Sequence, residues 1–335
     1  MDQKEQAAPK PMRIGKLSGA VHSSFAFLAG CQLDVFSPLG NGPKTPAQIA
    51  EALDVREDKL RPLLYALVAS ELMNVDDELF SNTDEANHYL VKGQPTYIGG
   101  MHELISTMWE AELLTASSIR AGKPLAKHDY SDSTEEELKK VFRGLHPRAI
   151  GDARSLANQY DFSRHHTLLD VGGGSGGMAI GVLGTHLHMT ATVIDLSTVT
   201  PITMDFVNES DVSERIQVKA VDILNEKIGD TYDIATLRAF IQVLGVEQSK
   251  HALKEVSKAL KPGGELFILG SVLDDSRVSP PATVAFNLLF LNVYDEGQAY
   301  TEQEYRNWLG EAGFENISRE VLPDGSSIIH GQKPA

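Results

Sequence analysis

The sequence is short of cysteine, of basic side chains and of long apolar runs. Cys31 is its single cysteine, so an intrachain disulfide and a zinc site built from several cysteines are both excluded. No stretch approaches the roughly 20 apolar residues of a membrane-spanning helix. Basic residues number 30 against 46 acidic ones, which leaves a net charge of −16. Because nucleic acid and anionic membranes both attract positive surfaces, neither is an expected partner. We expect a cytoplasmic protein.

What the chain does have is an ordinary globular composition over a length typical of two domains. Its 335 residues are 42% hydrophobic and 23% charged, which is ample for a buried core. The first half reads as helices, and the second half alternates short β-branched runs with helix-length segments. We expect a flexible tail over residues 1–13, a winged-helix-like domain over 14–100, a helical linker and pocket lid over 101–165, and an α/β domain over 166–335.

The winged-helix outline comes from a helix–turn–helix pattern and a hairpin between residues 45 and 83. Thr45 can cap the first helix, with Pro46 at its first position. This outline invites a DNA-binding interpretation, but ten acidic residues stand against five basic ones between Pro43 and Lys92. Neutralising phosphates needs the opposite sign. We therefore prefer a dimerisation module. The apolar helix expected over residues 19–36 agrees, since it must be covered by something.

The second half predicts a doubly wound, mostly parallel sheet that ends in an antiparallel hairpin. Five strands are expected at residues 167–171, 191–196, 215–221, 232–237 and 265–270, and the hairpin at 316–322 and 326–332. Helices are expected between them, over residues 176–185 and 247–260. This alternation is typical of a Rossmann-like fold.

The sharpest local pattern is the run D-V-G-G-G-S-G-G over residues 170–177, which follows a strand and opens a helix. Gly172, Gly174 and Gly177 fit the G-x-G-x-x-G spacing of a dinucleotide site. The same run also fits the D-x-G-x-G-x-G form that is associated with S-adenosylmethionine. The glycines alone leave both interpretations open.

Two carboxylates favour the methyl donor over a dinucleotide. Asp170 would repel a pyrophosphate at the glycine turn, whereas it suits a ligand with cationic ammonium and sulfonium groups. Asp222 follows the third strand and could bond an adenine amino group. Asp195, at the end of the second strand, could hold a ribose in either case.

These runs resemble the S-adenosylmethionine-dependent O-methyltransferases of the caffeate and acetylserotonin type, which include the bacteriochlorophyll C-20 methyltransferase. The resemblance extends from about residue 17 to the C-terminus and is strongest over residues 168–174, 193–196, 220–222 and 259–264. It implies a homodimer that forms through the N-terminal domain. It also implies a cofactor site made of Asp170, Gly172, Gly174, Asp195, Leu196, Asp222, Ile223 and Arg238.

The family pattern fails at the general base. Relatives that deprotonate a phenol carry a histidine after the fourth strand, and Gln242 occupies that place. Glutamine cannot accept a proton near neutral pH. The two glutamates that orient this histidine in the plant-type enzymes fall near Gly270 and Ala299. The acceptor must then be an acidic hydroxyl, an electron-rich carbon, or a group served by another base.

The candidates for catalysis and for substrate contact come from the expected helical linker and lid, from Gln242 and from an apolar helix late in the chain. Gln242, His146 and His102 are the candidates for a catalytic role, with Gln242 as a hydrogen-bonding group. The candidate substrate contacts are Met101, Trp109, Phe142, Phe286, Asn287, Phe290 and Tyr294. No metal is implied, since no clustered ligand set appears in these segments.

The sequence therefore predicts a homodimeric S-adenosylmethionine-dependent methyltransferase that acts on a hydroxyl of a small aromatic or polycyclic metabolite. Two alternatives keep the cofactor: methylation of carbon, and a family member that performs non-methylating chemistry. A winged-helix regulator is the weaker alternative from another class.

Overall fold

The computed structural model describes residues 10–94 and 96–335. They form two compact units, which divide between Ile105 and Ser106. Most of the expected tail, residues 1–9, lies outside the described residues, and helix begins at Met12. The segment 101–165, predicted as a linker and lid, contributes to both units. Within the described ranges, no helix combines the length and the apolar character needed to cross a membrane.

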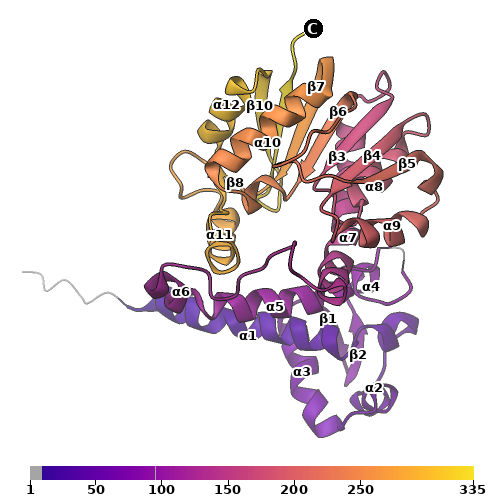
Figure 1. The fold of residues 1–335 in the computed structure, drawn as a ribbon. Helices are drawn as coiled ribbons and strands as arrows, with labels where there is room; N and C mark the ends of the chain where they lie inside the picture. Colours follow the sequence, from indigo (N-terminus) through magenta and orange to yellow (C-terminus); the bar gives the residue numbers. More distant parts are fainter. Residues whose placement is uncertain (1–9, 95) are drawn as a thin grey trace, which may run out of the picture. The chain divides into compact units, whose positions relative to one another are not determined.

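The first unit is mainly helical and has the predicted order of two short helices followed by a hairpin (Figure 1). Thr45 accepts a hydrogen bond from the Gln48 N–H while the Gln48 side chain accepts one from the Thr45 N–H, so the expected cap is confirmed. Its elements are α1 (Met12–Gln32), η1 (Ser37–Asn41), α2 (Pro46–Leu53), α3 (Glu57–Ala69), β1 (Met73–Asp76), β2 (Leu79–Asn82), α4 (Asp84–Tyr89) and η2 (Gly99–Met101). Helix α5 (His102–Glu112) crosses the boundary between the units.

Helix α1 has apolar side chains on both its buried and its exposed surface. Part of its apolar surface is therefore left uncovered in the single chain. Its C-terminal half is packed in the core of the unit, where Ala26, Leu28 and Cys31 are buried. Its N-terminal half leaves Ile14 at 69% and Leu17 at 77% exposure. An exposed apolar stripe of this kind is typical of a surface that another chain covers.

The second unit is built on a seven-stranded sheet with the order β10-β11-β7-β6-β3-β4-β5. Strands β3 to β7 are parallel, and β11 and β10 add the antiparallel hairpin, as predicted. The strands are β3 (Thr167–Val171), β4 (Thr190–Asp195), β5 (Ile216–Ala220), β6 (Tyr232–Arg238), β7 (Leu260–Gly270), β10 (Glu315–Val321) and β11 (Ser327–Gln332). A short pair, β8 (Val272–Leu273) and β9 (Tyr300–Thr301), lies outside this sheet.

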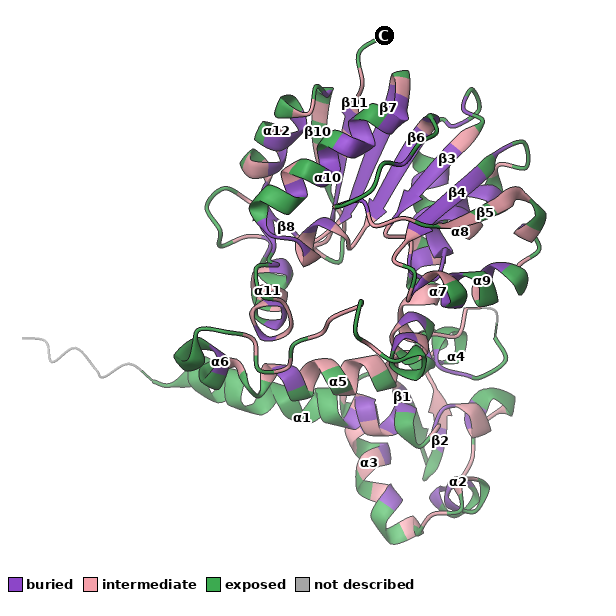
Figure 2. Ribbon diagram, viewed as in Figure 1, coloured by how far each residue is buried: buried purple, intermediate pink, exposed green. Residues whose placement is uncertain are grey.

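Helices cover both faces of the sheet, which confirms the doubly wound architecture (Figure 2). Side chains alternate between the faces because successive residues of a strand point to opposite sides. Leu169 belongs to the apolar core that includes residues of α10 and α12, whereas its neighbour Leu168 belongs to the core that includes residues of α7 and α8. The helices and turns of the unit are α6 (Thr115–Ala121), α7 (Glu135–Gln159), α8 (Gly177–Thr185), α9 (Thr200–Asn208), η3 (Ser213–Arg215), η4 (Ile241–Val243), α10 (Val246–Ala259), α11 (Pro281–Val293) and α12 (Glu302–Glu311).

The topology places one edge of the sheet in position to bind a ligand. Strand β3 lies at the centre of the five parallel strands, with β4 on one side and β6 on the other. The chain reverses its direction of winding there, so the loops that follow these strands splay apart and leave a crevice at their carboxyl ends. The glycine run leaves β3 at this point.

Candidate active site

The glycine loop adopts backbone conformations that side chains disfavour. Gly172, Gly174 and Gly176 have φ angles of 59°, 55° and 71°. A Cβ at Gly172 would lie 2.3 Å from the Phe240 ring, and one at Gly174 would lie 2.5 Å from the Phe142 ring. Glycine is therefore required at both positions by conformation and by space.

Asp170, which lies just before the glycine loop, links strand β3 to helix α8. Its carboxylate is fully buried, accepting bonds from the Thr236 hydroxyl at 3.1 Å and from the Ala179 N–H of α8 at 3.4 Å. Burial raises the pKa of Asp170 to about 7, and these two hydrogen bonds oppose that rise. The residue thus ties the end of β3 to the start of the next helix.

Asp195, at the end of β4, holds the loop from the other side. Its two oxygens accept the Gly174 N–H and the Leu196 N–H, both at 2.8 Å. Burial raises the pKa of Asp195 to about 6, against the effect of these two bonds. Each carboxylate oxygen can accept a further bond. Asp195 can therefore receive hydroxyl groups of a ligand while it fixes the loop.

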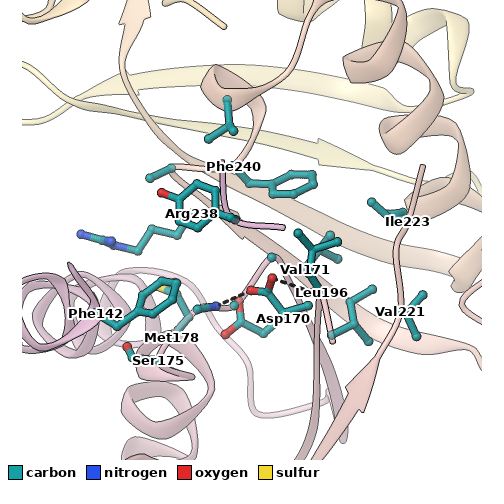
Figure 3. A pocket seen from close by; sticks show the side chains of 18 of the residues that line it. Phe142, Asp170, Val171, Ser175, Met178, Leu196, Val221, Ile223, Arg238 and Phe240 are labelled. Carbon is teal, nitrogen blue, oxygen red and sulfur yellow. Dashed lines mark hydrogen bonds between the residues drawn. The ribbon is translucent and has the colours of Figure 1, made fainter. Parts of the chain in front are cut away.

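The third strand contributes Asp222 and an apolar wall. The Asp222 carboxylate accepts the Leu224 N–H at 3.0 Å and the Asn225 side-chain amide at 2.7 Å, which holds the turn after β5 in shape. Ile223 is buried beside it. Val221, Ile223 and Leu196 lie together on one side of the cavity (Figure 3).

Arg238, the last residue of β6, lies on the opposite side from this apolar wall (Figure 3). Its Nε donates to Asp152 of α7 at 2.8 Å. The next residue, Ala239, has a φ of 52°, a conformation that non-glycine residues adopt mainly at turns and functional sites. The chain is therefore bent sharply where it leaves β6 for the site.

These residues enclose one cavity of about 190 Å³ at the carboxyl ends of the strands. Nine residues that the sequence singled out line it together: Asp170, Gly172, Gly174, Asp195, Leu196, Asp222, Ile223, Arg238 and Phe142. Sequence reasoning missed Tyr130 and Phe240, which also line it. Phe240 could have been found by its place two residues beyond β6. Tyr130 lies in an irregular segment, where no pattern marks it.

Gln242 is not among the residues that line this cavity. It lies in η4, and its side-chain Oε1 accepts the N–H of Ser271 at 3.2 Å. A Cβ at Gly270 would lie 2.8 Å from the same Oε1. Gln242 stands where relatives carry the histidine, and Gly270 falls near the place of one of the glutamates that orient it. The structure places these two residues beside each other.

His146 packs behind the glycine loop. Its Nδ1 lies 2.8 Å from the Ser175 hydroxyl, and its ring stacks on Phe206 with a centroid separation of 4.4 Å. Burial lowers the pKa of His146 to about 4, so the ring is neutral at neutral pH. His102 and Met101 belong to the first unit, where Nδ1 of His102 bonds the Gly99 carbonyl at 2.9 Å. The catalytic roles of both histidines stay predictions.

The other expected substrate contacts gather mainly on α11. Phe286 and Phe290 make an edge contact at 5.2 Å, and Phe290 stacks with Tyr294 at 6.0 Å. The Asn287 Oδ1 accepts the Ala299 N–H at 2.7 Å. Asn287 and Tyr294 line a second cavity of about 480 Å³. Trp109 lies on α5 and lines neither cavity.

Two family models match separate parts of this chain. The O-methyltransferase domain matches residues 120–315 and the O-methyltransferase dimerisation domain matches residues 16–92. The chain belongs to the O-methyltransferase family. It is an S-adenosylmethionine-dependent enzyme of that family, so the predicted fold, enzyme class and cofactor are confirmed.

Relatives match over nearly the full length. The tetracenomycin polyketide synthesis 8-O-methyl transferase TcmO of Streptomyces glaucescens is 24% identical over 97% of both chains. The 3-hydroxy-5-methyl-1-naphthoate 3-O-methyltransferase of Streptomyces sahachiroi is 27% identical over 96% of this chain and 95% of that protein. The structure of human N-acetylserotonin methyltransferase in complex with SAM superposes with a TM-score of 0.84 at 22% identity, covering 98% of this chain and 99% of that one.

Proposed function

We propose that this O-methyltransferase transfers a methyl group to a hydroxyl of a small aromatic or polycyclic metabolite. The observation that carries the proposal is the convergence of nine predicted residues on one cavity beside the glycine loop. The relatives support an aromatic acceptor, since two of them are named for a polyketide and for a hydroxynaphthoate. Methylation of carbon and non-methylating chemistry remain the alternatives from the same cofactor.

The cavity fits S-adenosylmethionine by its charge and its shape. Asp195 lines the cavity and Asp170 lies buried at its wall, so the acidic groups favour a cation, whereas a dinucleotide would bring a pyrophosphate. The positive φ angles of Gly172 and Gly174 leave the backbone open to close approach by a ligand. When it is bound, the cofactor supplies an activated methyl group on a sulfonium sulfur.

We assign roles to the chain's own residues on that basis. Asp195 would accept the ribose hydroxyls, and Asp222 with Ile223 would contact the adenine. Gly172 and Gly174 would lie under the methionine part, with Arg238 near it. The walls of the site then serve to align the acceptor oxygen with the methyl carbon and to exclude water, which is where most of the rate can come from in a displacement of this kind.

We propose further that the protein is a homodimer joined through its first unit. The dimerisation family model over residues 16–92 supports this assembly. The exposed apolar half of α1, with Ile14 and Leu17, supplies a surface of suitable chemistry. Sedimentation of the wild type against Ile14→Glu/Leu17→Glu tests it, and an unchanged mass for the two proteins would contradict it.

Calorimetric titration with S-adenosylhomocysteine tests the cofactor assignment. We expect binding in the wild type, and the absence of heat at millimolar ligand would overturn the proposal. The mass of the product separates the chemical alternatives. A gain of one methylene equivalent, with release of S-adenosylhomocysteine, excludes non-methylating chemistry, and proton NMR of the product distinguishes a methoxy group from a methyl group on carbon.

A further inference from the structure

Arg238 brings a positive charge into a cavity whose other charged groups are acidic. Three carboxylates line the same cavity, those of Asp170, Asp195 and Asp222. Among the described residues that line it, Arg238 alone is basic, and its side chain is 14% exposed. Burial raises the pKa of Asp170, and the nearby charge of Arg238 opposes that rise. A ligand that carries one anionic group beside its cationic ones therefore has one place in the cavity for that group.

The guanidinium of Arg238 is occupied at one edge and open at the other. A guanidinium carries its N–H donors in a planar fork. The Nε of Arg238 donates to the Asp152 Oδ2 at 2.8 Å, whereas its Nη1 and Nη2 donate to no acceptor in the described part of the chain. In Figure 3 the side chain extends away from Val221 and Ile223, toward the end of the site where Phe142 lies. The two Nη atoms are therefore available to a ligand, away from the apolar wall.

Asp152 is held in place by the close packing of α7 on α8. A Cβ at Gly177 would lie 2.6 Å from the Ala149 Cβ, and one at Gly181 would lie 2.5 Å from the Ala153 Cβ. A Cβ atom cannot rotate away as the end of a long side chain can, so the glycines of α8 are what allow this segment of α7 to approach. Asp152 lies within the segment. The carboxylate that bonds the guanidinium therefore stands on a helix whose position is tied to the helix that follows the glycine loop.

A second arginine, Arg148, contacts Asp152 from a more exposed position. Its Nε lies 4.0 Å from the Asp152 Oδ2, and its guanidinium also bonds Asp324 in the turn between β10 and β11. Its side chain is 53% exposed, so this contact is the weaker of the two that Asp152 makes. Asp152 itself does not line the cavity. It can therefore affect a ligand there only through Arg238, which makes it a positioning residue.

We propose that Asp152 positions Arg238 so that the two free Nη atoms bind the carboxylate of the cofactor's methionine part. The inference rests on the proposed function, which places that part of the cofactor over Gly172 and Gly174. A guanidinium fork binds a carboxylate through two parallel N–H···O bonds. A fork that is already held loses less rotamer freedom when the ligand binds. Asp152 thus contributes to cofactor recognition without touching the cofactor, and it helps to fix the place from which the methyl group is transferred.

The first experiment compares two probes on the full-length protein in the absence of any acceptor. S-adenosylhomocysteine carries the carboxylate, whereas 5′-(3-aminopropylthio)-5′-deoxyadenosine has a hydrogen atom in its place and keeps the ammonium group. We expect calorimetry to show that loss of the carboxylate weakens binding at least about tenfold, the scale of one charge-assisted hydrogen bond. Equal affinities for the two probes would overturn the inference. Failure of both probes to bind would instead overturn the proposed function.

Variants at the two positions assign this preference to the ion pair. Arg238→Met should weaken S-adenosylhomocysteine at least about tenfold, while the decarboxylated probe should bind as well as before or more tightly, since a cationic neighbour is gone. Asp152→Ala should weaken S-adenosylhomocysteine about fivefold, because the fork is no longer held. Asp152→Asn keeps an acceptor for the Arg238 Nε, so its affinity should lie between those of Asp152→Ala and the wild type. If Asp152→Ala binds S-adenosylhomocysteine as tightly as the wild type or more tightly, the inference fails.

A double-mutant cycle and a matched control separate positioning from a general loss of structure. Because Asp152 acts through Arg238, adding Asp152→Ala to Arg238→Met should change neither affinity by more than about twofold. Asp205→Ala removes another carboxylate that bonds α7, 3.0 Å from the Lys139 Nζ, but Asp205 does not line the cavity. This control should leave both affinities unchanged. Additive losses in the double variant, or equal weakening of both probes by Asp152→Ala, would show that Asp152 acts on the fold and would contradict the inference.

Discussion

Two regions of the second unit are built in different ways: the cofactor side, made of the residues proposed to bind the cofactor, and the acceptor side, made of Gln242 and the residues on and after α11 predicted to act on or contact the acceptor. The cofactor side comes from short runs at the ends of consecutive strands, and its carboxylates bond backbone N–H groups of the glycine loop and of the turn after β5. The acceptor side depends on contacts between distant segments, such as Gln242 with Ser271 and Asn287 with Ala299. Local motifs therefore build the proposed cofactor site, whereas contacts between distant segments position the residues predicted to contact the acceptor.

The most damaging change should fall on the cofactor side, at Asp195. Asp195→Ala leaves the N–H groups of Gly174 and Leu196 without their acceptor and removes a ligand for hydroxyl groups. Bonds to charged groups are worth about 1.5–3 kcal/mol each, so we expect affinity for S-adenosylhomocysteine to fall by at least about 100-fold. Calorimetry measures it. Asp211→Ala, at an exposed position, is the control, and a loss below about tenfold would mean that the loop keeps its shape without this carboxylate.

A smaller loss is expected from crowding the glycine loop itself. Gly174→Val imposes a β-branched side chain on a φ of 55° and drives it into Phe142. A strain of about 2 kcal/mol predicts roughly 30-fold weaker binding of S-adenosylhomocysteine. The matched control is Gly184→Ala, where a Cβ meets nothing within 4 Å. If both variants bind the ligand like the wild type, close backbone approach is not part of recognition.

The difference between local motifs and contacts between distant segments also explains which features the sequence could predict. Strand β3 was predicted at its observed limits, and the eight residues predicted to bind the cofactor line one cavity, because each lies at or just beyond the carboxyl end of a strand whose partners are set by the βαβ order. Tyr130 could not be found, since its place in the cavity depends on an irregular segment that lies along the end of α11, where the His128 N–H bonds the Val293 carbonyl at 2.9 Å. The pairing of Gln242 with Ser271 was equally hidden, because it joins residues beyond two different strands.

The buried carboxylates predict opposite pH trends for stability and for binding. The pKa values of Asp195 and Asp170, raised to about 6 and about 7, exceed the ordinary value, so folding favours their protonated forms. Their contribution to the stability of the free protein is complete below about pH 4 and declines as pH rises to about 7. Ligand hydroxyls bond better to an ionised Asp195, so affinity for S-adenosylhomocysteine should rise about tenfold per pH unit below pH 6. Thermal unfolding and calorimetry follow the two trends. Asp195→Asn should flatten the binding trend, and a trend that survives it would assign the titration to another group.

The smallest effect should come from a change at His146. The sequence predicts a catalytic role for this residue, but in the structure it packs behind the glycine loop. A general base would cost about 10²–10⁴-fold in turnover when removed. A residue that supports Ser175 from behind the loop should cost far less. We expect His146→Asn to lower kcat less than about tenfold, because the amide can replace the bond to Ser175. Steady-state kinetics with and without this change, at pH values on either side of neutrality, decide between the two roles. If kcat falls by more than about 100-fold while the affinity for S-adenosylhomocysteine is unchanged, His146 acts as the general base.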